Sequence, residues 1–350
     1  MNIPMKHFLM LLLLTCTLDA QMFASEFNKR YGENFYPPPG KILHMAGQTR
    51  EGFADYVEHV TEDGKQCDLP AGVAFYSSLY RTGFKTPHAN LPGDDHQDLS
   101  NVLSRYEHLI PQISIWADEQ ELVQIALGQQ DENIEKVAKL LISYQRPIYL
   151  RFAGECDDGR YKDPEAYKKA YRHVVDLFVA HGVKNVSYVW QSIGLKPTFQ
   201  DRDPLDWYPG DAYVNWIGIS FYQIDKEGYY PDHNRDRVLE IAREKKLPIM
   251  IVESSAIRKT AGQKKLTGQA YWNYWYKPYF EFIERNSEVR GFSIIDTNWD
   301  SQQQFKRFDW GDARLEEDPV VLEHWRNQLQ DPRYLHSQEN LYELLGYRAE

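Results

Sequence analysis

The stretch from residue 146 to residue 182, RPIYLRFAGECDDGRYKDPEAYKKAYRHVVDLFVAHG, decides the fold, because it holds a strand and a helix in immediate succession. Its first part is apolar apart from Arg151, which is typical of a strand in a parallel sheet covered on both faces. The acids Glu155, Asp157 and Asp158 follow at the end of this run. The run therefore predicts a strand that delivers acidic side chains to its carboxyl end.

The second part of the stretch predicts a helix with defined ends. Asp163 is a favourable N-cap residue, Pro164 suits the first helical position, and Gly182 is typical of a helix stop. Apolar side chains recur at helical spacing along one face, at Tyr167, Tyr171, Val174, Val175 and Phe178. The two parts together form one βα unit.

Similar apolar runs begin about every 25 to 45 residues, roughly the length of one βα unit in an eight-fold barrel. The runs are KILHMAG from Lys41, GVAFYSSLY from Gly72, LIPQISIW from Leu109, RPIYLRFAG from Arg146, NVSYVWQS from Asn185, VNWIGISFY from Val214, LPIMIVES from Leu247 and VRGFSIID from Val289. Only the connection between the fifth and sixth runs offers turns rather than a full helix. The pattern predicts an α/β fold, a single (β/α)8 TIM barrel.

An open doubly wound sheet is the rival fold. Such a sheet usually carries a glycine-rich G-x-G-x-x-G turn after its first strand. The first run here ends in MAGQTREG, which lacks that spacing, so a dinucleotide site is not expected.

The first residues resemble a secretory signal. Lys6 precedes the apolar block FLMLLLL, and small residues follow it, which predicts a signal peptide over residues 1–24 and a catalytic domain over residues 25–350. The block is too short to span a bilayer, which needs about 20 apolar residues. A lipoprotein signal ending at Cys16 is the alternative. We therefore expect a secreted or periplasmic protein.

The net charge limits the classes of molecule that the protein is expected to bind. The net charge of −11 disfavours nucleic acid, whose binding rests on neutralising phosphates with Lys and Arg. No second apolar stretch is long enough to cross a membrane. We expect a monomer whose partner is a polysaccharide or oligosaccharide substrate, for the reasons that follow.

In barrels of this kind the chemistry lies where the strands end. The predicted strand ends carry two glutamates among several aromatic side chains: Trp116, Glu155, Trp190, Gln191, Tyr222, Glu253, Asp296, Asn298 and Trp299. Glycoside hydrolysis needs one carboxyl to protonate the departing oxygen and a second to attack or to activate water. Aromatic rings complement the apolar faces of sugars. The pattern thus indicates a glycosidase.

The segments RPIYLRFAGE, NVSYVW, WYPGDAYVNWIGISFY and PIMIVES resemble glycoside hydrolase family 26, which contains β-mannanases and related β-glycanases of the retaining clan A. The resemblance covers about residues 40–310. It implies that Glu155 is the general acid/base, that Glu253 is the nucleophile, and that Tyr222 orients the nucleophile. Arg151 also fits the family pattern. The implied enzyme is a retaining hydrolase of a β-linked polysaccharide that uses no metal and no cofactor.

One position departs from the family. The β-mannanases carry His just before the acid/base, where this sequence has Gly154, so mannan specificity is in question. A catalytically inactive carbohydrate-binding barrel is the alternative function. Retention of Glu155, Glu253 and Tyr222 favours the enzyme, because a pure binder has no use for the charged pair.

The remaining expectations concern side chains around the acids. We expect Trp190 and Trp299 to be sugar platforms, together with Trp116 and Arg151 in substrate binding, and Trp216 to be core. Asp157 and Asp158 are interpreted as a solvated turn. Two further expectations are that Cys67 and Cys156 form no disulfide, because they lie at opposite ends of the barrel, and that the loop over residues 80–98 closes one end of the cleft.

Overall fold

The structure is a computed structural model that describes residues 30–48, 52–79, 99–194, 202–222, 233–257, 265–303 and 305–348. The signal peptide predicted over residues 1–24 lies outside the described residues. So does the loop over residues 80–98 that was expected to close the cleft.

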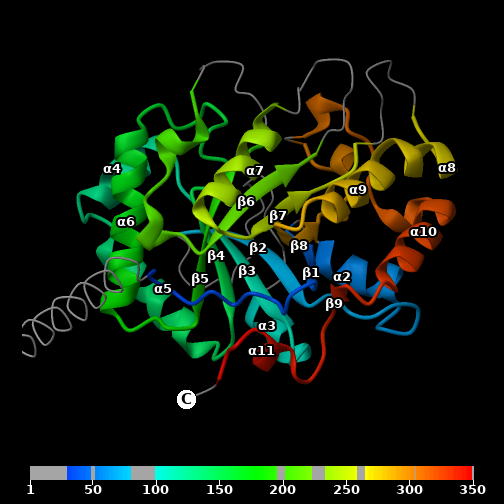
Figure 1. The fold of residues 1–350 in the computed structure, drawn as a ribbon, viewed down its shortest axis with the longest axis horizontal. Helices are drawn as coiled ribbons and strands as arrows, with labels where there is room; N and C mark the ends of the chain where they lie inside the picture. The colour runs from blue at the N-terminus through cyan, green and yellow to red at the C-terminus, as the bar shows by residue number, and fades with distance from the viewer. Residues whose placement is uncertain are drawn as a thin grey trace, which may run out of the picture.

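Eight parallel strands close into a barrel, as the sequence predicted (Figure 1). Closure follows from the first strand, β1, which pairs with β2 on one side and with β8 on the other. A two-residue strand, β9 (Tyr334–Leu335), adds to β1 outside the barrel. The barrel strands are β1 (Ile42–Gly47), β2 (Gly72–Ser78), β3 (Ile110–Trp116), β4 (Ile148–Phe152), β5 (Val186–Ser192), β6 (Trp216–Phe221), β7 (Ile249–Ser254) and β8 (Val289–Ile294).

Helices surround the barrel, with α4 and α6 on one side and α8 to α10 on the other (Figure 1). They are α2 (Gly52–Asp55), η1 (Tyr56–Thr61), α3 (Leu99–Arg105), α4 (Glu119–Ala126), α5 (Asp131–Ser143), α6 (Pro164–Ala180), η2 (Pro204–Trp207), η3 (Asp211–Tyr213), α7 (His233–Lys245), α8 (Gly268–Tyr271), η4 (Trp272–Tyr276), α9 (Lys277–Arg285), η5 (Trp299–Ser301), η6 (Lys306–Phe308), η7 (Leu315–Glu317), α10 (Pro319–Leu329) and α11 (Leu341–Leu344).

The local signals of the sequence account for these helices. Asp163 caps α6 by accepting hydrogen bonds from the backbone N–H groups of Glu165 and Ala166, and Pro164 begins the helix, as predicted. The described part of the connection between β5 and β6 contains the two short 3₁₀ helices η2 and η3, in agreement with its turn-rich sequence.

Two apolar layers stabilise the fold. One fills the barrel interior near the amino ends of the strands and includes Tyr149, Val189, Trp216 and Met250. Trp216 is therefore part of the core, as expected. The other lies between the strands and the outer helices and includes the aromatic residues of α8, η4 and α9. The upper interior, near the carboxyl ends of the strands, is polar instead, and it holds the site described below.

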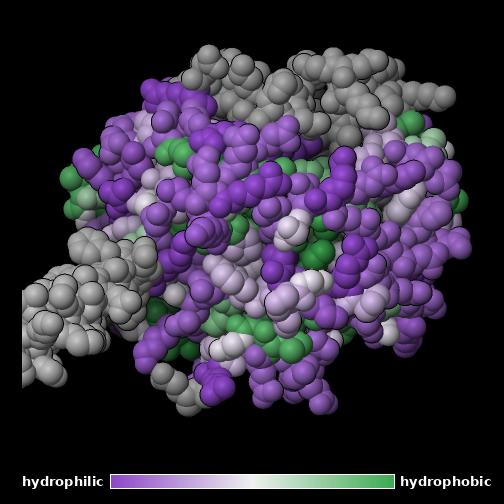
Figure 2. Space-filling model, in the orientation of Figure 1, coloured by the Kyte–Doolittle hydropathy of each residue, from purple (hydrophilic) through white to green (hydrophobic). Residues whose placement is uncertain are grey.

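The face of the molecule in Figure 2 is mostly covered by polar side chains, and its hydrophobic residues appear as small separate patches. Among the described residues, no helix combines the length and apolar character needed to cross a membrane. Cys67 and Cys156 are both free, which confirms the prediction that they are not bridged.

Candidate active site

The site is a polar layer in the upper barrel interior, built by four neighbouring strands. Arg151 on β4, Gln191 on β5, Ser220 on β6 and Glu253 on β7 are all buried there. Ser220 lies directly beside Glu253, at a point where the register between β6 and β7 shifts. A register shift of this kind redirects side chains, and such irregularities are frequent next to active sites.

Glu253 is held by donors on two sides. The guanidinium of Arg151, which has no exposed surface, donates from Nη1 to Oε1 of Glu253. The hydroxyl of Tyr222 donates to Oε2 over 2.7 Å. Gln48 at the end of β1 accepts from Nη2 of Arg151 over 2.6 Å and so fixes the guanidinium. The side chain of Glu253 is 11% exposed, so these charge-assisted bonds act with little screening.

Glu155 has weaker partners. Ser220 Oγ donates to its Oε1 over 2.8 Å, and Arg160 Nη2 lies 3.4 Å from its Oε2. Arg160 makes its shorter contact, 2.5 Å, with Asp158. The backbone around Glu155 is strained, because Ala153 and Glu155 have φ angles of +46° and +54°. A non-glycine residue in this region costs about 1–3 kcal/mol, and such residues cluster at functional sites.

The two carboxyls differ in pKa because their surroundings differ. Burial, followed by the negative charge of Glu253, raises the pKa of Glu155 to about 8. Burial also opposes ionisation of Glu253, but the charge of Arg151 and the hydrogen bonds from Tyr222 and Arg151 outweigh it, so the pKa of Glu253 lies below its usual range. At neutral pH the site therefore holds one protonated and one ionised carboxyl, as acid/base chemistry requires.

Tyr222 remains a proton donor in this arrangement. Burial and the negative charges of Glu253 and Glu155 raise the pKa of Tyr222 well above its usual value. A phenol that stays protonated donates to Glu253 throughout the working pH range.

The interpretation of Asp157 and Asp158 as a solvated turn is wrong for Asp157. Asp157 is buried and accepts hydrogen bonds from Ser192 Oγ over 2.7 Å and from the N–H of Ile193 over 2.8 Å. Burial raises the pKa of Asp157 to about 6. This carboxylate ties the loop that carries Glu155 to the end of β5. Asp158 lies nearer the surface and pairs with Arg160.

Two of the expected sugar platforms are corrected by the structure. Trp190 is 0% exposed, because its side chain points out of the barrel and packs edge-on against Tyr208 beneath the outer helices. Trp299 is also buried, donates to Ser255 Oγ over 2.8 Å, and is covered by Phe305 and Trp310. Neither ring presents a face to a ligand.

Other aromatic side chains reach the surface near the acids. Trp116 lies at the end of β3, as predicted from the sequence, and its side chain is half-buried. Trp310 is half-buried and stacks on Tyr222, with ring centroids 5.7 Å apart and planes at 24°. Phe308 stacks on Trp310 in turn and is exposed. Trp310 and Phe308 escaped the sequence interpretation because they lie more than ten residues beyond the last strand.

Tyr76, Gln48 and Ser220 were also missed. Tyr76 on β2 is half-buried, and burial together with the charge of Glu253 raises its pKa well above the usual value. The signal that could have found all three is polarity within or just after an otherwise apolar strand.

Asp296 has a structural role beside the site. It is buried, accepts from the N–H of Leu315 over 2.7 Å, and has a pKa raised well above its usual value by burial and by the neighbouring Glu316. A cavity of about 240 Å³ opens next to it, between α2 and the residues that follow β8. Across the described ranges, no three His, Cys, Asp or Glu side chains converge as metal ligands.

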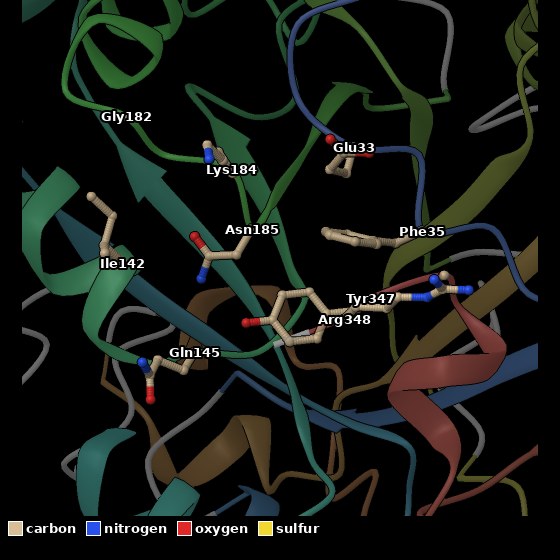
Figure 3. A pocket seen from close by; sticks show the side chains of 10 residues that line it. Glu33, Phe35, Ile142, Gln145, Gly182, Lys184, Asn185, Tyr347 and Arg348 are labelled. Atoms are coloured by element: carbon tan, nitrogen blue, oxygen red, sulfur yellow. The ribbon is translucent and has the colours of Figure 1, made fainter. Parts of the chain in front are cut away.

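A larger cavity, of about 410 Å³, lies at the opposite end of the barrel (Figure 3). Phe35 and Tyr347 line one side of the cavity, and Lys184 and Asn185, which precede β5, lie across from them. The cavity contains none of the predicted site residues, which lie where the strands end rather than where they begin.

Comparison with known proteins gives a consistent result. The model of glycosyl hydrolase family 26 matches residues 152–284. The chain is 29% identical over 337 residues to the β-1,3-xylanase TXYA of a Vibrio species, covering 89% of this chain and 69% of that protein. It is 28% identical over 340 residues to a β-1,3-xylanase of an Alcaligenes species, covering 89% and 68%.

Solved structures share the fold at lower identity. A family 26 β-mannanase from Bacteroides ovatus matches with a TM-score of 0.60 and 16% identity, covering 87% of this chain and 93% of that one. A double mutant of the endo-β-1,4-mannanase of Cellulomonas fimi matches with a TM-score of 0.60 and 17% identity, covering 92% and 80%. Identity this low supports the barrel and nothing finer.

Proposed function

Because the chain belongs to glycosyl hydrolase family 26, we propose that it is a retaining hydrolase of a β-linked polysaccharide in which Glu253 is the nucleophile and Glu155 the general acid/base. This proposal rests on one observation: the surroundings of two neighbouring carboxyls, Glu253 and Glu155, favour different protonation states. Arg151 and Tyr222 hold Glu253 ionised, whereas burial and the charge of Glu253 keep Glu155 protonated.

The mechanism proceeds in two displacements. Glu253 attacks the anomeric carbon and forms a covalent glycosyl-enzyme, while Glu155 gives its proton to the departing glycosidic oxygen. Glu155, now ionised, then removes a proton from the water that attacks the anomeric carbon. The bond to Glu253 breaks, its carboxylate is restored, and the released sugar keeps its β configuration. Tyr222 stabilises the carboxylate of Glu253 before attack and after release.

We propose β-1,3-xylan as the polysaccharide. Two β-1,3-xylanases match 89% of this chain at 28–29% identity, whereas the mannanase structures named above share 16–17%. Gly154 supports a substrate other than mannan. A Cβ at this position would overlap Oε1 of Gln191, so the histidine that the resemblance led us to expect would require Gln191 to move from the place it holds.

A substrate panel tests the proposal. Release of reducing ends would be measured from β-1,3-xylan, mannan, glucomannan and mixed-linkage glucan, with Glu253→Gln as the inactive control. We expect release from β-1,3-xylan, and product lengths then distinguish endo from exo action. Release from mannan alone would overturn the xylan assignment. Binding to a polysaccharide without any release would favour the alternative, a carbohydrate-binding barrel without catalysis.

For the aromatic contacts, we propose Trp116 and Trp310 in place of Trp190 and Trp299. Both rings are partly accessible, and Trp310 stacks on the tyrosine that holds the nucleophile. Arg151 acts through Glu253 rather than on the sugar, because its guanidinium has no exposed surface.

Export is the remaining part of the proposal. The basic residue, apolar block and small residues at the start of the sequence support a signal peptide over residues 1–24, followed by a catalytic domain over residues 25–350. Mass determination of the mature protein tests this. A lipid attached at Cys16 would replace the signal-peptide interpretation with the lipoprotein alternative.

A further inference from the structure

Three side chains link the two carboxyls through a continuous hydrogen-bonded relay. Arg151 Nη1 donates to Gln191 Oε1 over 2.9 Å, and Gln191 Nε2 donates to Ser220 Oγ over 2.9 Å. Ser220 Oγ then donates to Oε1 of Glu155 over 2.8 Å. Arg151, Gln191 and Ser220 are all buried, so water does not compete with these bonds.

The direction of every bond in the relay is fixed by its first member. A guanidinium has donors only, so it must face the carbonyl oxygen of Gln191 and turn the amide nitrogen toward Ser220. The Ser220 oxygen then accepts from that nitrogen, and its own proton is left for Glu155. If Ser220 accepted from Glu155 instead, its buried hydroxyl proton would lack an acceptor, which costs about 1–3 kcal/mol.

We propose that Gln191 and Ser220 are positioning residues that dictate which oxygen of Glu155 carries the catalytic proton. Oε1 receives the Ser220 hydroxyl over 2.8 Å, whereas Oε2 has only the 3.4 Å contact with Arg160 Nη2, which makes its shorter bond to Asp158. Oε1 is therefore the carbonyl oxygen of the neutral acid. The proton sits on Oε2. The inference deepens the proposed function and rests on it, since it specifies how the acid of that mechanism is presented to the leaving group.

The same guanidinium serves both carboxyls. Arg151 Nη1 donates to Glu253 as well as to Gln191, so one buried charge ionises the nucleophile and orients the relay that reaches the acid. Charge-assisted bonds are roughly twice as strong as neutral ones, and a chain of bonds aligned in one direction is polarised along its length.

Gly154 belongs to this arrangement. A Cβ at position 154 would overlap Oε1 of Gln191 and approach its Cδ to 3.0 Å. The amide that orients the relay therefore occupies the space of a side chain before the acid. Any larger residue at position 154 must displace Gln191 and break the relay at its centre.

The direct test is infrared difference spectroscopy on Ser220→Ala. The carbonyl band of neutral Glu155 is isolated by subtracting the spectrum of Glu155→Gln in the same background. Loss of a donor to the carbonyl oxygen moves such a band to higher wavenumber, so we expect an upward shift in Ser220→Ala and its reversal in Ser220→Thr, which keeps the hydroxyl. An unchanged band would overturn the proposal.

Kinetics provide an independent readout. On a β-1,3-linked xylo-oligosaccharide, which needs protonation of its leaving group, Ser220→Ala should lose about tenfold in kcat/KM, a part of the 10²–10⁴-fold that general acids supply. On a dinitrophenyl glycoside, which does not need it, the loss should be less than about threefold. Gly154→Ala should behave in the same way. Equal losses on both substrates would contradict the relay.

The control is Ser187→Ala, which removes another buried strand hydroxyl, bonded to the carbonyl of Asn34 over 3.1 Å at the other end of the barrel. It should leave both substrates and the carbonyl band unchanged. Failure of the relay is distinguishable from failure of the proposed function, because a Glu253 that can be labelled covalently beside an unshifted Glu155 band contradicts the relay alone.

Discussion

The ends of β4 and β7 each present one glutamate to the same space, yet the two are supported in different ways. Glu253 lies within β7 and receives a buried guanidinium and a phenol. Glu155 lies just beyond β4, on strained backbone, and receives one serine hydroxyl and a distant arginine. Carboxyls of the same chemical type thus acquire opposite protonation states from their neighbours, and the roles of nucleophile and acid that we propose rest on those neighbours.

Removing the charge of Glu253 should have the largest effect. Glu253→Gln keeps one acceptor oxygen, which Arg151 can use, and turns its amide nitrogen toward the Tyr222 oxygen. It cannot form the glycosyl-enzyme, so we expect kcat to fall by on the order of 10⁴-fold or more on every substrate. Steady-state kinetics measure this, with circular dichroism to verify folding. Glu253→Ala is the poorer variant, because removing one partner of a buried ion pair costs about 3–5 kcal/mol of stability. Appreciable turnover by Glu253→Gln would contradict the assignment of Glu253 as the nucleophile.

Removing the proton of Glu155 should have a smaller effect that depends on the substrate. Glu155→Gln should lose about 10²–10⁴-fold on unactivated oligosaccharides and much less in the first step with a dinitrophenyl leaving group. Parallel assays on the two substrates measure the difference. Glu165→Gln, a surface change in the first turn of α6, is the matched control. Identical losses on both substrates would argue against the acid role.

The pH profile of kcat/KM should report the pKa values of both Glu155 and Glu253. Activity requires Glu155 to be protonated, so it should fall about tenfold per unit as pH rises beyond about 8. It also requires Glu253 to be ionised, so it should fall only as pH drops below the usual glutamate value of 4.5. Tyr222→Phe removes a bond that lowers the pKa of Glu253, and should therefore move the acidic limb upward while leaving the alkaline limb in place. Movement of the alkaline limb alone would contradict the assignment.

The smallest expected effect concerns an aromatic residue that we propose to bind substrate beside the two glutamates. Trp116→Ala should raise KM about two- to tenfold with little change in kcat, since an aromatic contact is worth about 0.5–1.5 kcal/mol. Trp190→Phe, a change in the core, should leave KM unaltered. A kcat defect without a KM effect would place Trp116 in the chemistry instead.

The barrel could be predicted from the sequence because its signals are local. Apolar runs marked all eight strands, and Asp163 and Pro164 marked the start of α6. The acids could be found because they follow those runs. The orientation of individual side chains could not. In a strand buried on both faces, as β5 is, the sequence does not show that Trp190 faces outward and Gln191 inward.

Contacts between distant strands were equally hidden. The pairing of Arg151 with Glu253 joins β4 to β7 across the barrel, and the cover of Trp299 comes from Phe305 and Trp310 in a later loop. Asp157 appeared solvated because acids usually are, yet Ser192 and Ile193 satisfy it inside the protein. Such features depend on closure of the barrel and not on local patterns.

The assignment of Glu253 as the nucleophile is tested most directly by covalent trapping with a dinitrophenyl 2-deoxy-2-fluoro-β-xylobioside, which forms the glycosyl-enzyme quickly and releases it slowly. Mass spectrometry of the intact protein and of its peptides would locate the label. We expect one fluoroglycosyl group, attached to Glu253. A label on Glu155, or rapid turnover of substrate without any covalent adduct, would contradict the assignment.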